Sequence, residues 1–165
     1  MYDAIYDGNC SQIDSLIRLG LGVDTKAEGE EWNFLHMALV SLAIPPNPDV
    51  IRHLVSLGVD VNGRDSRMWT PLHFAIRTQN SIVVKILIDA GADVNAVNDE
   101  GISPLHLCVL ECPSCVRIAQ MLLAAGASPD TDKGGGTARH LANSISHPDS
   151  GALRELFAQH PSKKV

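Results

Sequence analysis

The sequence predicts an all-α repeat protein, in which pairs of antiparallel helices stack one after another, and two recurring patterns support this prediction. The first pattern is a helix opening centred on a histidine. It occurs as NFLHMA (33–38), TPLHFA (70–75), SPLHLC (103–108) and TARHLA (137–142). The four histidines are 37, 33 and 34 residues apart. A period close to 33 residues is typical of stacked helical units.

The second pattern is a glycine-containing segment that closes each unit. It occurs as LGLGVD (19–24), LGVDVN (57–62), AGADVN (90–95) and AGASPD (125–130). The first glycines of these segments are 38, 33 and 35 residues apart, so they repeat with nearly the same period as the histidines. Each unit is therefore predicted to contain a helix, a short loop, a second helix, a glycine stop and an extended connection.

The residue types of one unit justify each of its elements in order. Thr70 is a suitable N-cap and Pro71 a suitable first helical residue, because that position needs no backbone N–H. Leu72 and Ala75 are expected to face inward. Residues 81–89 (SIVVKILID) have apolar side chains at helical spacing and predict the second helix. Gly91 follows that helix and supplies a left-handed residue that ends it.

These motifs resemble those of the ankyrin-repeat family, whose repeats carry TPLHxA and a closing segment like GADVN. Residues 66–98 match best, 99–132 nearly as well, and the flanking units more loosely, so the resemblance covers almost the whole chain. It implies L-shaped units of two antiparallel helices and a short projecting β-hairpin, stacked into a curved solenoid. It also implies that the repeated histidines make hydrogen bonds within and between units and have no catalytic role.

We expect one ankyrin domain of about four full repeats plus an N-terminal partial repeat over residues 1–165. Its predicted parts are an N-terminal capping repeat (1–27), repeats at 28–64, 65–97 and 98–132, a C-terminal capping repeat (133–160) and a tail (161–165). A terminal repeat has only one neighbour, so it needs a polar outer face. Because both ends are expected to be capped in this way, we predict a monomer.

Some residues depart from the repeated pattern. Asn33 and Phe34 replace Thr and Pro in the second opening, which predicts a weaker cap with the fold retained. The prolines of IPPNP (44–48) lengthen the loop of that unit and are expected to stop its first helix early. Met68 stands where the family usually has a hairpin glycine.

Composition narrows the classes of partner. The net charge is −6, with only 13 Lys and Arg residues, which argues against binding to nucleic acid. No basic region followed by an apolar run opens the chain, and no apolar stretch reaches the roughly 18 residues of a membrane span. We therefore expect a cytoplasmic protein without a membrane partner.

The histidines and cysteines could suggest a metal or redox site. His53, His147 and His160 lie in different units, so we expect them at solvated positions. Cys112 and Cys115 form a CPSC motif, with Cys108 four residues before it. However, Cys108 occupies the small inward position of Ala75, and a second CxxC pair is absent, although structural zinc needs four ligands. We predict no metal and no cofactor, and we expect free thiols.

Enzyme motifs are also missing. The sequence has neither a GxSxG motif nor a P-loop, and the glycines at 134–136 are not followed by the Lys-Ser/Thr pair that phosphate binding requires. Catalysis is therefore not expected. A metal- or redox-active protein that uses the CxxC motif is the less favoured alternative.

What remains is binding to another protein. The family resemblance implies contacts at the hairpin tips and on the exposed face of each first helix. The positions that match are Trp32, Trp69, Ile102, Glu30, Arg67, Glu100, Tyr6, Asp7, Val40, Arg77, Thr78, Leu110 and Glu111. No catalytic, cofactor-binding or metal-binding residue is predicted.

Both tryptophans fall at the same repeat position. Trp is enriched among interface residues that contribute much binding energy. An exposed apolar strip of Trp32, Trp69 and Ile102 with a rim of acidic side chains (Glu30, Glu31, Glu100 and Glu111) would anchor a partner. Alternatively, the two rings stack on each other or on the hairpins and stiffen them. The sequence does not decide between these two roles.

Several functions fit such a surface. The first is a small stand-alone inhibitor that covers a partner's active site, such as an immunity protein that neutralises a basic toxin. An inhibitor of a cell-cycle kinase is comparable, and a general adaptor or scaffold is the remaining alternative. Size and charge alone favour the first.

Overall fold

The computed structural model describes residues 1–41, 44–111, 115–131, 134, 136–145 and 150–160. These residues form five successive helix pairs. The helices are α1 (Tyr2–Tyr6), α2 (Cys10–Arg18), α3 (Phe34–Leu39), α4 (Pro48–Ser56), α5 (Pro71–Arg77), α6 (Ser81–Asp89), α7 (Pro104–Leu110), α8 (Val116–Ala124), α9 (Ala138–Ser144) and α10 (Ser150–Ala158). The predicted second helix at 81–89 coincides with α6.

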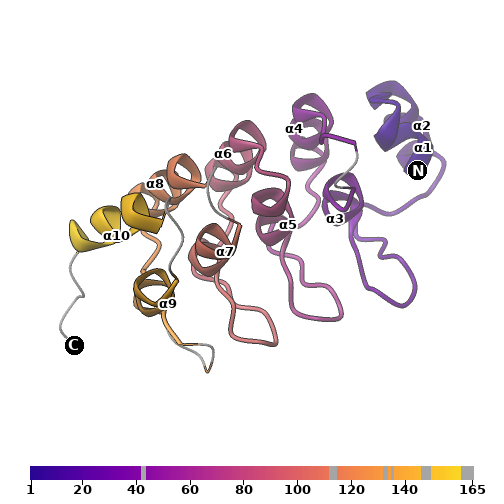
Figure 1. Ribbon diagram of the computed structural model, residues 1–165. Helices are drawn as coiled ribbons and strands as arrows, with labels where there is room; N and C mark the ends of the chain where they lie inside the picture. Colours follow the sequence, from indigo (N-terminus) through magenta and orange to yellow (C-terminus); the bar gives the residue numbers. More distant parts are fainter. Residues whose placement is uncertain (42–43, 112–114, 132–133, 135, 146–149, 161–165) are drawn as a thin grey trace.

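The helices lie in two rows (Figure 1). The inner row consists of α1, α3, α5, α7 and α9, and each of these helices contacts the next one. The outer row consists of α2, α4, α6, α8 and α10, and consecutive helices from α4 onward contact each other. Within each pair the two helices also touch. Each unit therefore packs against its neighbours in sequence order, and the predicted stacked all-α architecture is confirmed.

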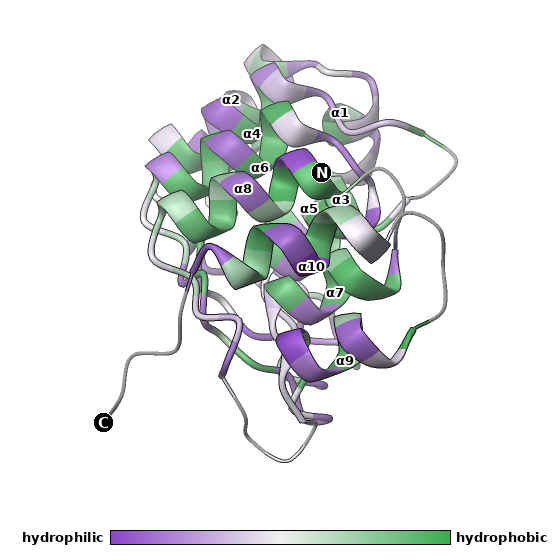
Figure 2. Ribbon diagram, turned by 60° about the vertical axis from the view of Figure 1, so that its left-hand side comes forward, coloured by the Kyte–Doolittle hydropathy of each residue, from purple (hydrophilic) through white to green (hydrophobic). Residues whose placement is uncertain are grey.

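The core lies between the two rows and is built mainly from small aliphatic side chains. Figure 2 shows that individual helices carry both hydrophobic and hydrophilic stretches, as expected when one face of each helix is buried. Leu72 and Ala75 of α5 are completely buried, as are Val83 and Leu87 of α6. The predicted inward orientation of Leu72 and Ala75 is thus confirmed.

The openings of the first helices follow the predicted chemistry, with one correction. Thr70 and Ser103 occupy the N-cap positions of α5 and α7, each followed by a proline. The expectation of a weaker cap at Asn33 is wrong. Its side-chain oxygen accepts hydrogen bonds from the backbone N–H groups of both Leu35 and His36, at 3.1 Å each. Asn is as good an N-cap as Thr, because its side-chain oxygen reaches the same backbone N–H groups, which have no partner within the helix.

Extended loops join the units and project beyond the inner row (Figure 1). We call residues 27–32 the first hairpin, 65–69 the second and 98–102 the third. One backbone bond closes each of them, for example from Asp65 N–H to the Trp69 carbonyl at 3.0 Å. The predicted β-hairpins are wrong in this respect, since no strand occurs among the residues that the structure describes. The paired segments are too short, so the loops consist of turns.

The backbone also has left-handed residues where the repeat requires them. Gly91 has a φ of 89°, which agrees with its predicted role in ending α6. Met68 in the second hairpin has a φ of 61°, although it carries a side chain. The hairpin turn therefore keeps its shape without the usual glycine, at the cost of some local strain. The predicted tail at 161–165 lies outside the described residues.

Candidate protein-binding surface

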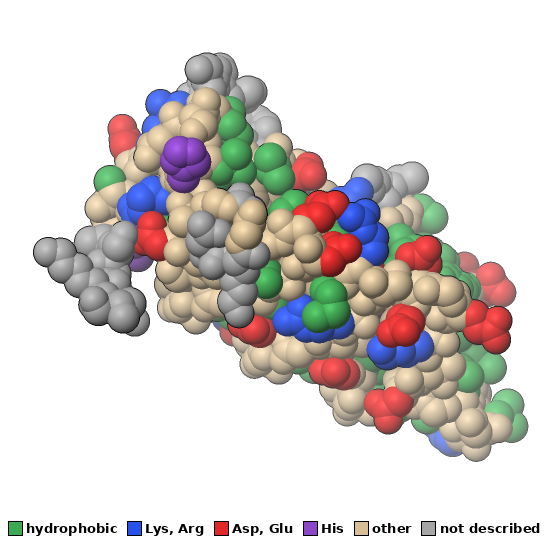
Figure 3. Space-filling model, turned by 90° about the horizontal axis from the view of Figure 1, so that it is seen from below, with side chains coloured by type: hydrophobic (Ala, Val, Ile, Leu, Met, Phe, Trp, Pro, Cys, Tyr) green, Lys and Arg blue, Asp and Glu red, His purple; other side chains and the backbone are tan. Residues whose placement is uncertain are grey.

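The three hairpins form one continuous ledge along the side of the molecule. Two backbone hydrogen bonds join neighbouring tips: Ser66 N–H donates to the Glu30 carbonyl at 2.9 Å, and Asp99 N–H donates to the Arg67 carbonyl at 3.2 Å. Seen from the hairpin side (Figure 3), acidic, basic and hydrophobic side chains are interspersed over this face. The ledge is held together by main-chain bonds, so its shape does not depend on mobile side chains.

Buried histidines attach the second hairpin, the third hairpin and Gly136 before α9 to the preceding repeat in each case. In His73, Nδ1 accepts from the Thr70 backbone N–H at 3.1 Å, and Nε2 lies 3.2 Å from the Ile102 carbonyl. Because a carbonyl can only accept, Nε2 carries the proton and the ring is neutral. His36 binds the Trp69 carbonyl in the same way at 3.1 Å, and His106 binds the Gly136 carbonyl at 3.0 Å.

Burial disfavours the charged form of these rings. It lowers the pKa of His73 from 6.5 to about 4, although the bond to the Ile102 carbonyl acts in the opposite direction. Burial also lowers the pKa of His36. The inter-repeat bonding expected from the family resemblance is therefore present at these positions. His140 differs, because its residue is exposed.

The tryptophans are half-buried, so the predicted apolar strip is less exposed than expected. Phe74 lies between them: its ring centroid is 6.1 Å from that of Trp32 and 5.7 Å from that of Trp69, with both contacts close to edge-to-face. The Trp32 indole N–H donates to Asp65 Oδ2 at 3.3 Å. These contacts support the stiffening role, and both residues remain partly exposed.

Two cations lie at or beside the second hairpin: Arg77 at the end of α5 and Arg67 at the hairpin tip. The Arg77 guanidinium carbon lies 5.6 Å from the centre of the Trp69 ring, which is within cation–π range. Arg67 forms ion pairs with Asp99 at 3.6 Å and with Glu100. The structure thus brings Trp32, Trp69 and Arg77 together around Phe74, and it pairs Arg67 with Glu100 at the tips. Sequence reasoning missed Phe74, although it is the variable residue of TPLHxA.

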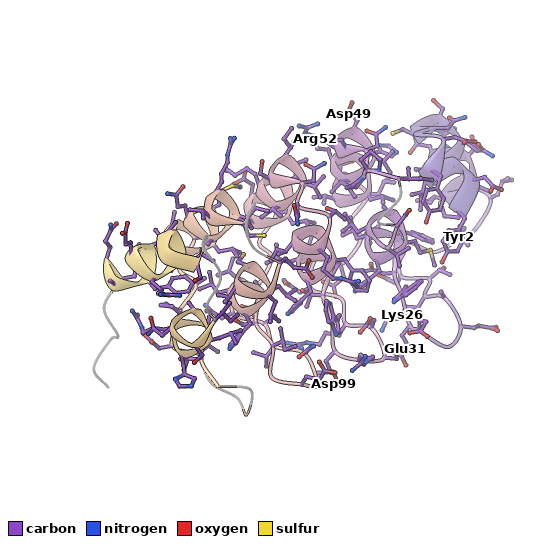
Figure 4. The ribbon with its side chains drawn as sticks, viewed as in Figure 1. Tyr2, Lys26, Glu31, Asp49, Arg52 and Asp99 are labelled. Atoms are coloured by element: carbon purple, nitrogen blue, oxygen red, sulfur yellow. The ribbon has the colours of Figure 1, made fainter. Side chains whose placement is uncertain are left out.

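The acidic rim is partly neutralised. Glu31 pairs with Lys26 at 3.3 Å, and Glu100 pairs with Arg67. Glu30 accepts a bond from the Ser66 hydroxyl at 3.3 Å. Figure 4 shows Lys26, Glu31 and Asp99 together on the hairpin side of the molecule. The contacts of Glu100 and Glu30 join residues 33 and 36 positions apart, so no local signal in the sequence predicts them.

The remaining predicted residues lie at the ends of the inner helices. Tyr6 at the end of α1 is exposed and stacks on Tyr2, with centroids 6.2 Å apart and planes 14° apart. The other five are Asp7, Val40, Thr78, Leu110 and Glu111. Leu110 is the most clearly available apolar residue, with 51% of its surface exposed. Tyr6 and Asp7 lie at the end of α1, the first helix of the inner row (Figure 1).

Two predictions about single residues need comment. The expected solvated position of His53 is wrong, because its side chain is only 23% exposed and its Nε2 lies 2.7 Å from Asp14 Oδ1, which links α4 to α2. Cys112 and the middle of the CPSC motif lie outside the described residues. Cys108 and Cys115 are both buried, and a hydrogen bond with the Cys108 thiol lowers the pKa of Cys115.

Over the described ranges, no group of three or more His, Cys, Asp or Glu side chains is placed to hold a metal ion. None of the described helices is both long and apolar enough to span a membrane.

The helix pairs stack in sequence order, and buried histidines bond neighbouring repeats to each other, which defines a repeat protein. Its hairpin ledge and the exposed ends of the inner row of helices are open to a partner. The family model for ankyrin repeats (three copies) matches residues 1–98 and 42–133. The chain therefore belongs to the ankyrin-repeat family, and ankyrin repeats are protein–protein interaction modules. A search of curated proteins found no match to the chain.

Proposed function

We propose that this protein is a small non-enzymatic inhibitor that covers the active site or binding face of one protein partner with its hairpin ledge and inner helix ends. The observation that supports this proposal most directly is the ledge itself. Its three tips are joined by main-chain hydrogen bonds, so the surface is already organised before a partner arrives. Binding then orders few side chains, which favours tight association.

We further propose that the partner has a basic surface. The chain has a net charge of −6, and the exposed tips carry Glu30, Asp99 and Glu100, partly balanced by Arg67. Charges on exposed tips accelerate encounter with a partner of opposite sign. A cytoplasmic monomer that neutralises a toxin as an immunity protein fits these features. An inhibitor of a kinase and a general adaptor are the alternatives that the experiment below must separate.

The test is affinity capture from the native cell with the wild-type protein and with a Glu30→Lys/Glu100→Lys variant. We expect one main partner on the wild type and its loss from the variant. A matched Glu155→Lys variant, changed on α10 far from the ledge, should retain the partner. Undiminished capture by the ledge variant would contradict the proposed surface.

The same experiment distinguishes an inhibitor from an adaptor. The captured partner is purified, and its own activity is titrated with the repeat protein. An inhibitor abolishes activity near one equivalent, while an adaptor leaves activity intact and brings down several proteins. A toxin gene beside the gene for this chain would specify the partner class.

A further inference from the structure

An open groove lies along the outer row, on the opposite side of the helix stack from the hairpins. Its volume is about 460 Å³, and it is lined mainly by Arg52 of α4, Ile82, Lys85 and Ile86 of α6, and Arg117 and Met121 of α8. A second hollow of about 300 Å³ shares Lys85 and Met121 and continues between α6 and α8. The two hollows together follow the nine residues of α6, a length of about 13 Å.

The floor of the groove is apolar. Ile82 has 55% of its surface exposed, whereas Val83 and Val84, the next two residues of the same helix, are completely buried. Ile82 is therefore not needed to hold the stack together and offers aliphatic surface to solvent. Ile86 and Met121 are half-buried beside it and pack against the core. Met side chains adapt to ligands of different shape.

The rim of the groove is mostly basic, with three cations and one acid (Asp89), although the whole chain is acidic. Arg52, Lys85 and Arg117 come from three consecutive outer helices. Arg52 pairs with Asp49 at 2.6 Å, and Lys85 pairs with Asp89 on its own helix. More than half of every one of these four side chains is exposed, and such pairs exchange readily with other charges.

Arg117 differs from the other two cations. It forms no ion pair with any residue in the described part of the chain, and it is exposed. Figure 4 shows Asp49 and Arg52 at the outer edge, on the opposite side from Lys26, Glu31 and Asp99. The cationic rim is thus spatially separate from the acidic hairpin tips.

We propose that the α6–α8 groove is a second docking surface, which binds an acidic amphipathic helix of a protein partner. Apolar residues at i, i+4 and i+7 of a helix span about 10 Å, which fits the length of the groove. Acidic residues beside that stripe would pair with Arg117, Lys85 and Arg52. Because the groove and the ledge lie on opposite sides, the protein binds two partners at once.

The test is selection of a displayed library of random 16-residue peptides on the full chain. Selection is followed by counter-selection on an Ile82→Asp/Arg117→Glu variant. Both residues are exposed, and unchanged melting of the variant checks its fold. We expect the survivors to be acidic and to carry an apolar stripe at helical spacing. Enrichment of basic or proline-rich sequences, or of no sequence, would overturn the proposal.

The enriched peptide is then synthesised, and its affinity is measured by fluorescence anisotropy. Arg117→Glu and Ile82→Asp should each weaken binding roughly tenfold. The matched controls Arg18→Glu and Leu19→Asp, which change an exposed cation and an exposed aliphatic residue at the end of α2, should leave it unchanged. Equal losses in the controls would show non-specific adsorption and reject the groove.

Other occupants give different results. A mass that doubles with concentration in light scattering, and that Ile82→Asp returns to the monomer value, would assign the groove to a second copy of the chain. Binding to vesicles of phosphatidylserine but not to the peptide would assign it to a lipid surface. Either result overturns the proposal. Loss of the ledge partner leaves this test unaffected, because the variants lie on different faces.

Discussion

The second and third hairpins differ in the chemistry of one buried side chain that shapes both loops. Asp65 and Asn98 occupy the same repeat position, and in each the Oδ1 atom accepts two backbone N–H groups of its own loop, at 2.8 to 3.0 Å. The other terminal atom differs. Asp65 Oδ2 accepts from Trp32 at 3.3 Å, whereas Asn98 Nδ2 is buried and has no hydrogen-bond partner among the described residues. One oxygen thus shapes the loop, and the second atom controls coupling to the preceding hairpin.

The two junctions between hairpins are consequently held by different interactions. The first and second hairpins share a half-buried indole–carboxylate bond and the packing of both tryptophans on Phe74. The second and third hairpins share the ion pairs of Arg67, in which about half of each side chain is exposed. Exposed ion pairs contribute little and weaken with salt. Stability along the ledge is therefore uneven, although the repeats look alike.

Removing the aromatic contact should produce the largest difference between the two junctions. Phe74→Ala is expected to lower the free energy of unfolding by about 3–5 kcal/mol, because both tryptophan rings lose their common neighbour. Leu107 is the equivalent residue in the next repeat, and Leu107→Ala should cost less, about 2–3 kcal/mol. Urea denaturation followed by circular dichroism measures both. Equal costs would mean that the tryptophans add nothing to the second hairpin.

Acid should weaken the hydrogen bond through which His73 joins the repeat at 65–97 to the repeat at 98–132. The folded-state pKa of His73 is about 4, below the usual 6.5. Between these two values the unfolded chain binds more protons than the folded chain. The contribution of neutral His73 to the free energy of unfolding is therefore complete above pH 6.5 and is lost as the pH falls to 4. The shift corresponds to roughly 3 kcal/mol of unfolding free energy. Urea titrations at pH 7, 5.5 and 4.5 measure the loss, and His73→Gln should reduce the slope. An unchanged slope in that variant would rule out His73 as the cause.

Converting the second hairpin to the chemistry of the third should have an intermediate effect. In Asp65→Asn, the side-chain oxygen can still shape the loop, but an amide N–H would face the Trp32 indole N–H. Leaving buried donors unpaired costs about 1–3 kcal/mol. Thermal unfolding gives the loss, and Trp32 fluorescence should shift as its bond breaks. Asp99→Asn changes an exposed acid in the next hairpin and provides the matched control, with little effect expected.

The helices and their order could be predicted from the sequence because local chemistry determines them. The Thr70–Pro71 pair and Gly91 mark helix ends that the structure confirms. Asn33 departs from the family motif but caps α3 fully, because its side-chain oxygen has the same capping chemistry as the Thr hydroxyl. Local signals thus predict the solenoid well, even where single residues depart from the family pattern.

The surface could be predicted only in outline. Repeat position correctly brings Trp32 and Trp69 into one row, but their half-burial depends on Phe74, which belongs to the neighbouring helix. The pairing of Arg67 with Glu100 joins residues 33 positions apart. Contacts between repeats arise from the stacking geometry, which a single repeat does not encode.

The smallest effect is expected from the reverse exchange, Asn98→Asp. The new carboxylate keeps one oxygen for the Glu100 and Ile102 N–H groups and presents a second acceptor where the buried Nδ2 now lacks a partner. Trp69 stands at the repeat position from which Trp32 donates to Asp65. If the Trp69 indole N–H donates to the new carboxylate, the free energy of unfolding should rise by about 0.5–1 kcal/mol. The cost of burying the charge of that carboxylate reduces this gain. The measurement is a double-mutant cycle with Trp69→Phe. A coupling energy near zero would show that the Trp69 indole makes no such bond, so that the Arg67 ion pairs remain the side-chain link between the two tips beside the main-chain bond from Asp99 N–H to the Arg67 carbonyl.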